Sequence, residues 1–355
     1  MKLLVTGASG FVGRYVVAAA LRRGHAVRAM VRPHATMEGL GWRNHAGVEY
    51  ARCDLRLREG LNQAVAGIDA VIHLAAAMRG DFYTRFAGTV TATEHLLSAM
   101  TESGVDHIVA VSSFAVYDYL RCASWSALDE NSPLERRPQQ RHAYAQTKLI
   151  QERVIGAHAK KHGWKWTVIR PGAVWGKDHW WTTRLGIQVG RWWVRLGARA
   201  PVPLTYVENC AEAIVLAAER PEAVGEVLNI VDDDPPSQQK YMAELRHRIA
   251  PRPRVFPVSR AVLQGIALMV TLVNGLCFGG RAKVPAVLVP SSLCASAKPL
   301  RYPNRKARAL LGWRPRYALG QALARCFDDA LQADVVDACT ATERATHPAL
   351  VGAGA

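Results

Sequence analysis

The sequence predicts an α/β fold built on an open parallel sheet. A glycine-rich turn, Gly7, Gly10 and Gly13, links a short apolar run to a helical pattern, and further apolar runs alternate with helices downstream. The first run, residues 2–6, is predicted to be a buried strand, and a helix is predicted to begin at Phe11. Glycines let a backbone approach a pyrophosphate, and free N–H groups at a helix start face its charge. The opening therefore predicts a dinucleotide site.

Two further strands supply the next candidate cofactor contacts. Residues 25–31 end at Arg32, where an NAD-binding chain usually carries an acidic residue for the ribose hydroxyls. We expect Arg32 to meet a 2′-phosphate instead; the alternative is a solvated cation in a basic protein. Residues 48–52 form the third strand, and Asp54 and Leu55 follow it at a position expected to touch adenine.

The fourth predicted strand runs through residues 69–76 into Leu74, Ala75 and Ala76. Small side chains there leave room for a cofactor beside the backbone, and the continuous apolar run indicates burial on both faces. His73 lies in this strand. We interpret it as a structural, hydrogen-bonded histidine and not as a catalytic group.

The fifth strand, residues 108–111, precedes Ser113 at the sheet edge where open parallel sheets bind ligands. Tyr144 and Lys148 lie one helical turn apart and share a face. A tyrosine of ordinary pKa near ~10 is a poor acid–base group at neutral pH, and a neighbouring ammonium can lower that pKa. We expect Ser113 to hold a substrate oxygen while Tyr144 exchanges its proton. The alternative is a chance pair on a solvated helix.

These motifs, taken together, resemble the extended short-chain dehydrogenase/reductase family, in its NAD-dependent epimerase/dehydratase and 3β-hydroxysteroid-dehydrogenase-like group. The matching segments follow the family order along most of the chain. They are residues 6–13, 54–55, 73–76, 111–117 and 128–133, Tyr144 with Lys148, and residues 170–176, 206–209 and 311–315.

The resemblance implies a Rossmann-type doubly wound parallel sheet with a smaller C-terminal substrate lobe over the nicotinamide. It also implies that Tyr144 is the acid/base, that Lys148 binds the nicotinamide ribose and tunes Tyr144, and that Ser113 contacts the substrate oxygen. The predicted cofactor-binding residues are Gly7, Ser9, Gly10, Phe11, Val12, Gly13, Arg32, Asp54, Leu55, Leu74, Ala75, Ala76, Tyr144, Lys148, Pro171, Gly172 and Val174.

The resemblance also divides the chain. Residues 1–170 are predicted to form the dinucleotide-binding domain, to which residues 200–232 return. The substrate lobe is expected to comprise residues 171–199 and 233–330. A tail rich in Ala, Thr and Gly, residues 334–355, is expected to be loosely ordered.

The chain departs from the family pattern at three places. Thr89 stands where the family often has Asn in its fourth helix, which leaves one backbone-stabilising or water-ordering contact open. Asp118 stands where nucleotide-sugar members usually carry Gly. The usual lead-in to the segment 206–209 is replaced by residues 203–205, which weakens a nucleotide-sugar interpretation without excluding it.

The composition of the chain limits the remaining classes of function. With 355 residues and 50% hydrophobic content the chain can bury a large core. Seven scattered cysteines without a close pair indicate reduced thiols in a cytoplasmic setting, and argue against a zinc site or disulfides, so no metal site is predicted. No signal peptide fits before the first strand. The formal charge of +16 comes without a nucleic-acid-binding motif, so no nucleic-acid partner is expected.

Two segments of the second half are unusual. Residues 179–199 alternate paired tryptophans with arginines, and residues 261–278 contain no charge. The second segment is close to the length of a membrane span, although Gln264 and Asn274 weaken that interpretation. The default is a buried or partly exposed helix of the substrate lobe. A third interpretation is a peripheral membrane contact, with tryptophans at the interface and arginines near lipid phosphates.

The combined prediction is an NAD(P)(H)-dependent oxidoreductase that transfers a hydride at a secondary alcohol or ketone of a bulky, lipid-like or sterol-like small molecule. NADP(H) is favoured as the cofactor, and NAD(H) stays open. The alternative is a nucleotide-sugar epimerase or dehydratase that returns the hydride, and a remote alternative is a non-catalytic dinucleotide sensor. A sensor has no need for Ser113, Tyr144 and Lys148. A homodimer also stays open.

Overall fold

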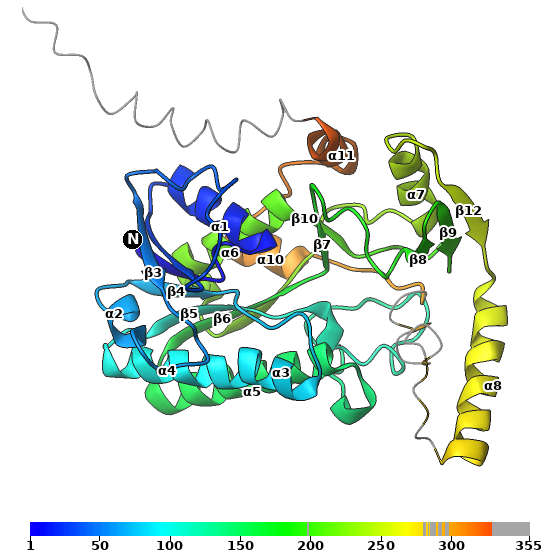
Figure 1. The fold of residues 1–355 in the computed structure, drawn as a ribbon, viewed down its shortest axis with the longest axis horizontal. Helices are drawn as coiled ribbons and strands as arrows, with labels where there is room; N and C mark the ends of the chain where they lie inside the picture. Colours follow the sequence, from blue (N-terminus) through cyan, green and yellow to red (C-terminus); the bar gives the residue numbers. More distant parts are fainter. Residues whose placement is uncertain are drawn as a thin grey trace, which may run out of the picture.

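A seven-stranded parallel sheet forms the centre of the computed structural model (Figure 1). The structure describes residues 1–196, 199–279, 282, 284, 289, 293–294 and 298–328. The strand order is β11-β6-β5-β4-β1-β2-β3, so the chain reverses direction of winding between β1 and β4. The strands are β1 (Lys2–Thr6), β2 (Ala26–Val31), β3 (Val48–Arg52), β4 (Ala70–His73), β5 (His107–Val111), β6 (Lys165–Pro171) and β11 (Glu226–Ile230). The predicted Rossmann-type doubly wound sheet is confirmed.

Helices cover both faces of this sheet. On one face α1 packs against α6, with α10 nearby, and on the other lie α2, α3, α4 and α5 (Figure 1). Their bounds are α1 (Phe11–Arg22), α2 (Leu61–Val65), α3 (Phe82–Phe86), α4 (Ala92–Glu102), α5 (Ala143–His162), α6 (Val207–Glu219) and α10 (Arg305–Leu311). Short helical turns complete this part: the π-helical η1 (Ala87–Thr91) and the 3₁₀ turns η2 (Phe114–Val116), η3 (Pro138–Gln140) and η4 (Pro221–Ala223).

The strands are apolar at nearly every position because the two faces of the sheet pack in two different hydrophobic cores. Leu3 and Val5 of β1 pack in the core below α1 and α6, whereas Leu4 packs in the core below α4. Successive side chains of a strand point to opposite faces. A strand covered on both sides therefore needs an apolar residue at every position.

The remaining elements lie outside the central sheet and its flanking helices, and we refer to them together as the smaller lobe. They are the parallel pair β7 (Ala173–Trp175) and β10 (Leu204–Tyr206), the three-stranded sheet of β8 (Gly186–Val189), β9 (Trp192–Arg195) and β12 (Arg254–Pro257), and the helices α7 (Gln238–Arg246), α8 (Arg260–Phe278) and α11 (Leu319–Phe327). The predicted domain boundaries stay a prediction, and the predicted loose tail, residues 334–355, lies outside the described residues.

The tryptophan segment differs from the membrane-facing arrangement predicted for it. Trp193 is 1% exposed in the main core, and the rings of Trp180 and Trp181 lie 6.2 and 4.9 Å from its ring. Only Trp192 of these four is strongly exposed, at 45%. Side chains alternate along β9, so Trp193 faces inward where Trp192 faces outward. The paired tryptophans are therefore mainly a packing device.

Candidate active site

The glycine turn between β1 and α1 has the shape that a dinucleotide needs. Gly7 has φ of 68°, and the Gly10 N–H donates to the Gly7 carbonyl at 3.0 Å. A Cβ on Gly13 would lie 2.1 Å from the Gly7 oxygen, so only glycine fits there. No side chain caps the N-terminus of α1. Its first N–H groups are therefore free to meet phosphate oxygens.

The loops after β1, β2 and β4 are tied together around this turn. The Ala8 N–H donates to Met30 O at 3.2 Å, and the Thr6 hydroxyl accepts from the N–H groups of Leu74 and Ala75, each at 3.2 Å. Ala76 follows them, half-buried. These bonds hold the predicted phosphate-binding and ring-binding segments at one edge of the sheet.

The side chains of this turn and of the β3 loop lie at different depths. Ser9, Phe11 and Val12 are half-buried, and the Phe11 ring lies 4.0 Å from the His179 ring of the smaller lobe. Leu55 is buried in the core below α4, so its backbone is the part that can meet an adenine.

Arg32 is exposed at the end of β2, as the cofactor prediction requires. Asp54 pairs with Arg56, whose Nε lies 3.0 Å from Oδ1. Hydrogen bonds from Arg56, with a smaller contribution from the Arg32 charge, hold the pKa of Asp54 below its usual value. Arg32 and Arg56 thus add positive charge at the end of β2 and in the loop after β3.

The segment after β6 closes the other side of the site. A Cβ on Gly172 would lie 2.3 Å from the Pro203 oxygen, and the Gly172 N–H donates to Ile230 O at 3.0 Å. Pro171 is the last residue of β6, and Val174 lies half-buried in β7. Close backbone contacts therefore fix this predicted cofactor segment.

Ser113 and Tyr144 meet beyond the carboxyl end of β5. Ser113 caps η2, where its Oγ accepts the Ala115 N–H at 3.1 Å. Tyr144 lies in the first turn of α5, which His142 caps by accepting the Ala145 N–H on Nδ1 at 3.2 Å. The Ser113 hydroxyl lies near enough to the Tyr144 phenol to lower its pKa. Two helix starts thus position the two hydroxyls.

Burial raises the pKa of the Tyr144 phenol, while the Ser113 hydrogen bond and the Arg85 charge lower it. The sequence reasoning expected Lys148 to lower this pKa. The ammonium of Lys148 is instead engaged elsewhere, since Nζ donates to Val111 O at 2.7 Å and to Gln151 Oε1 at 2.9 Å. Tyr144 is therefore protonated at neutral pH and is suited to donate a proton.

Lys148 lies at one end of a buried polar chain. The Gln151 amide donates to Thr93 Oγ1 at 2.9 Å and lies 3.2 Å from His73 Nε2, and His73 Nδ1 lies 2.8 Å from Thr6 Oγ1. Burial lowers the pKa of Lys148 to about 8 and that of His73 to about 3. His73 is thus a neutral, hydrogen-bonded structural histidine, as interpreted from the sequence.

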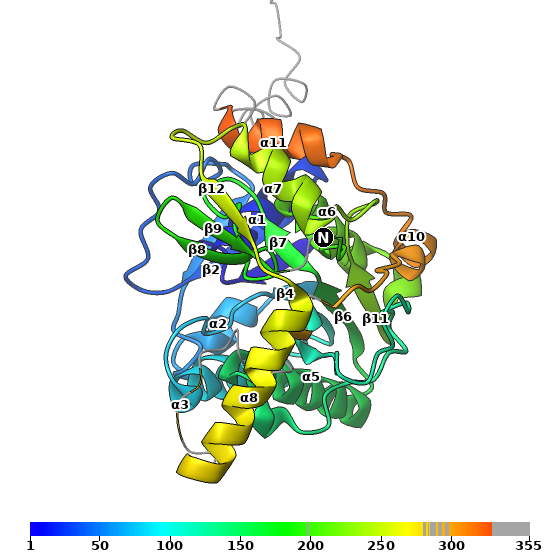
Figure 2. The same cartoon turned by 90° about the vertical axis from the view of Figure 1, so that its right-hand side faces the viewer.

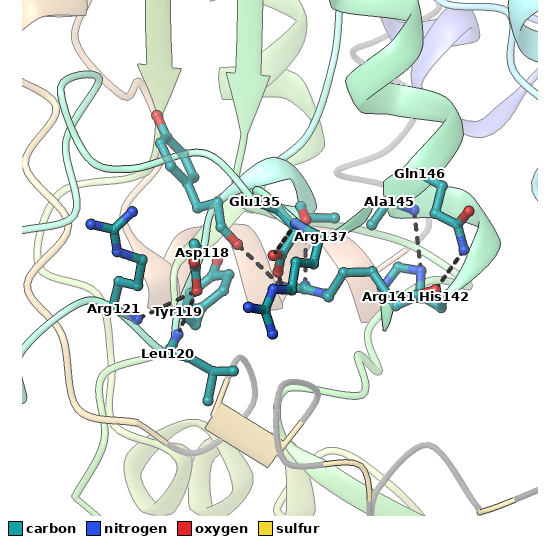
Figure 3. A network of polar contacts seen from close by, with 12 residues as sticks. Asp118, Tyr119, Leu120, Arg121, Glu135, Arg137, Arg141, His142, Ala145 and Gln146 are labelled. Carbon is teal, nitrogen blue, oxygen red and sulfur yellow. Dashed lines mark hydrogen bonds and ion pairs between the residues drawn. The ribbon is translucent and has the colours of Figure 1, made fainter. Parts of the chain in front are cut away.

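A second buried network joins the Ser113 segment to the start of α5 (Figure 3). Arg141 Nη1 donates to Tyr117 O at 3.2 Å and to Glu135 Oε2 at 3.3 Å, and the Glu135 N–H donates to Val116 O at 2.9 Å. Asp118 accepts from the N–H groups of the next turn, including Leu120 at 3.1 Å. Asp118 therefore closes a turn at this departure from the family pattern.

Thr89, the other departure, lies buried in η1 and accepts the Ala77 N–H on Oγ1 at 3.1 Å. Sequence reasoning missed Gln151, Glu135 and Arg141. Gln151 lies one turn beyond Lys148 on α5, and that spacing is the signal that could have found it. The Glu135 to Arg141 pair has no comparable local signature.

A separate cavity of about 800 Å³ lies beyond the end of β11. Its lining includes Asp232, Asp233, Arg301 and Arg305, and does not include Ser113, Tyr144 or Lys148. It is therefore not the site of the chemistry. Among the described residues no group of three or more His, Cys, Asp or Glu side chains could hold a metal ion.

This fold, with its glycine turn and Ser, Tyr and Lys side chains, defines the class of extended short-chain dehydrogenases/reductases. Residues 3–230 match the NAD dependent epimerase/dehydratase family, and the chain belongs to that family. It is an NAD(P)-dependent enzyme of the oxidoreductase/epimerase type, and the predicted class is confirmed. The individual cofactor contacts and catalytic roles stay predictions.

Two curated relatives are similar over most of their length. A 4-hydroxy-2-methyl-3-oxo-4-farnesyl-3,4-dihydroquinoline-1-oxide ketoreductase of Stigmatella aurantiaca is 30% identical over 91% of this chain and 95% of its own. A 3 beta-hydroxysteroid dehydrogenase/Delta 5-->4-isomerase of Mycobacterium tuberculosis is 29% identical over 92% and 89%.

Solved structures share the fold. The UDP-glucose 4-epimerase of Thermus thermophilus, in complex with NAD, aligns with a TM-score of 0.66 at 20% identity, covering 94% of this chain and 99% of its own. The UDP-glucuronic acid 4-epimerase of Bacillus cereus, also with NAD, gives 0.68 at 20% identity over the same shares.

Proposed function

We propose that this enzyme interconverts a ketone and a secondary alcohol on a bulky apolar molecule, with NADP(H) as its cofactor. The observation that carries the proposal is the proximity of the Ser113 hydroxyl to the Tyr144 phenol, whose pKa it lowers, together with Lys148 one helical turn further along α5, where Nζ donates to Val111 O at 2.7 Å. In the reducing direction Tyr144 donates its phenolic proton to the substrate oxygen, which also accepts a hydrogen bond from Ser113. The bound nicotinamide supplies the hydride.

The substrate class rests on the relatives. The two relatives above are named for a farnesylated quinoline oxide and for a hydroxysteroid, both large and mainly apolar.

Arg32 supports the choice of NADP(H). It is exposed at the end of β2, and Asp54, a carboxylate that its charge affects, is already paired with Arg56. A guanidinium here favours a 2′-phosphate over free ribose hydroxyls.

Product analysis tests the proposed reaction. Purified enzyme is incubated with NADPH and a panel of sterol, prenylated and nucleotide-sugar ketones, and NADP⁺ formation is measured with alcohol formation. We expect equal amounts of both from an apolar ketone. Conversion of a nucleotide sugar without net NADP⁺ formation would replace this proposal with the returned-hydride alternative.

We propose in addition a cytoplasmic location with peripheral contact to a membrane. The chain carries a formal charge of +16, which attracts it to anionic surfaces, and an apolar substrate would be stored in lipid. Fractionation of cells at low and high salt tests the location. A homodimer stays a prediction, which analytical ultracentrifugation decides.

A further inference from the structure

The helix α8 exposes an apolar surface that no described part of the protein covers. Only 11% of the stretch Ala261–Phe278 is buried inside the protein, and the mean hydropathy of this stretch is 1.9. Leu268, Leu272 and Leu276 are 66%, 62% and 77% exposed. Soluble proteins rarely leave contiguous apolar surface of this kind in water. Among the described residues α8 is the one helix long and apolar enough to cross a membrane.

Only the first half of α8 is held by the lobe. Leu263 and Ala267 are buried against Leu196 and Leu293, whereas residues 271–278 contain no buried side chain. Figure 2 shows α8 extending beyond the rest of the described chain at its C-terminal end. The buried first half of α8 therefore sets the direction in which the exposed apolar second half extends.

Both ends of α8 belong to the same folded lobe. It follows β12, and Asn274 near its end exchanges two hydrogen bonds with Ala282, at 3.1 and 3.0 Å. Lys298 then donates to Tyr119 O at 2.9 Å, so the chain has returned to the substrate side. A helix that crossed the bilayer would leave its two flanking segments on opposite sides, whereas here β12 and Lys298 both belong to the same folded body. Entry into one leaflet fits this arrangement.

An aromatic and basic rim lies at the anchored end. The guanidinium groups of Arg254 and Arg191 lie over the exposed ring of Trp192, at 5.2 and 5.9 Å, and Phe256 of β12 is 59% exposed. Tryptophan with arginine is the composition that the headgroup region prefers. A second copy of this chain fits less well, because two basic molecules repel each other.

We propose that α8 is a monotopic membrane anchor that inserts its exposed leucine face into one leaflet of an anionic bilayer, with Trp192 at the headgroup level. The anchor would place the substrate lobe where an apolar ketone is dissolved. Only this last consequence rests on the proposed function, and the binding itself does not.

Vesicle flotation of the purified full-length protein tests the anchor. The vesicles contain phosphatidylcholine alone or with a quarter phosphatidylglycerol. Wild type should float with the anionic vesicles, and Leu272→Glu should weaken binding by about tenfold because a charge is placed in the inserted face. The matched control is Leu57→Glu, at a residue 58% exposed in the other domain, which should bind as wild type does.

Insertion has its own readout. Cys277 is exposed on α8, so an environment-sensitive dye can be attached to it in a variant that keeps no other cysteine. Its emission should shift to the blue with anionic vesicles and be quenched by brominated acyl chains. An unshifted dye on bound protein, or equal binding by Leu272→Glu, would overturn the proposal.

Two further measurements separate the competing outcomes. If wild type is a dimer in solution, Leu272→Glu is a monomer and neither floats, a second copy covers α8 and the anchor is wrong. Leu272→Glu should keep the wild-type NADPH-dependent rate with a detergent-soluble ketone while it loses rate with a vesicle-dissolved one. These measurements distinguish failure of the anchor proposal from failure of the proposed reaction. If the wild type inserts into vesicles but reduces no ketone, only the proposed function is refuted.

Discussion

At the scale of single residues, Lys148 is held by partners that the motif does not contain. Its Nζ has a backbone acceptor, Val111 O, and a side-chain acceptor, Gln151 Oε1, and the latter is fixed in turn by Thr93. A buried ammonium without a bonded carboxylate loses hydration that these dipoles only partly replace. That loss explains why its pKa falls to about 8.

Tyr144→Phe tests proton transfer. The ring and its packing stay, and only the phenolic hydroxyl near Ser113 is removed. Turnover should fall by about 10²-fold or more, while NADPH affinity from fluorescence titration should change by less than about threefold. Tyr83→Phe, at an 80% exposed tyrosine, is the matched control. Near-normal turnover in Tyr144→Phe would refute the assigned role.

Gln151→Leu tests the support of Lys148. The charged form of Lys148 is lost as pH rises through about 8, and removing its side-chain acceptor makes the ammonium less stable. The alkaline limb of the kcat/KM profile should therefore move to lower pH, by about one unit. The exposed Gln63→Leu should leave the profile unchanged. An unshifted limb in Gln151→Leu would show that Lys148 does not control it.

Arg32→Ala tests cofactor choice. A charge-assisted contact to the 2′-phosphate is worth about 1.5 kcal/mol or more, so the preference for NADPH over NADH should fall at least about tenfold. Affinities for both cofactors are measured by titration. Arg153→Ala, at an exposed cation on α5, controls for general charge loss. A wild type that prefers NADH would contradict the assignment directly.

At the scale of elements, buried ionic contacts join segments that the sequence separates. Glu135 and Arg141 have side chains only 9% and 2% exposed, and their network links η2 to the start of α5. Those two elements carry Ser113 and Tyr144. The spacing of the two hydroxyls thus depends on a pair that touches neither of them.

Glu135→Gln should expose this dependence. Removing one charge of a buried pair leaves Arg141 uncompensated, at a cost of about 3 kcal/mol in the free energy of unfolding. Urea unfolding measures this, and kcat should fall as well because the hydroxyl spacing relaxes. Glu102→Gln, at a surface ion pair with Arg58, should leave the unfolding midpoint in place. Equal midpoints for both variants would deny the pair its role.

The strands were the most predictable elements. Residues 2–6 and 48–52 were predicted as they stand, and 25–31 differed from Ala26–Val31 by one residue. Runs buried on both faces leave an unbroken apolar signal between glycine turns. Gln151, Arg141 and the inward turn of Trp193 were not predictable in the same way, since they depend on partners that only the folded chain brings near.

At the scale of the whole molecule, two family motifs about a hundred residues apart meet on α6. The Trp313 Nε1–H donates to Asn209 O at 3.0 Å, and the Asn209 side chain bonds Asp232 Oδ1 and both backbone groups of Tyr317. A buried Arg325 to Glu208 pair adds α11 to this junction. The C-terminal helices are thus strapped to the cofactor domain.

Asn209→Ala should loosen this strap. It leaves several buried polar groups without partners, which costs about 3 kcal/mol in the free energy of unfolding. Urea unfolding followed by tryptophan fluorescence should show the loss, since Trp313 reports from the junction. The exposed Asn62→Ala is the control. An unchanged midpoint in Asn209→Ala would mean that the strap carries little stability.

The position of α8 also bears on how the rate of this enzyme has to be expressed. A protein held in a leaflet samples its substrate in two dimensions, so the relevant quantity is the mole fraction of ketone among the lipids. Adding inert lipid at constant total ketone would slow such an enzyme, although the molar concentration in the tube has not changed. Kinetic constants would then belong to the surface, and the composition of the membrane would itself set the flux.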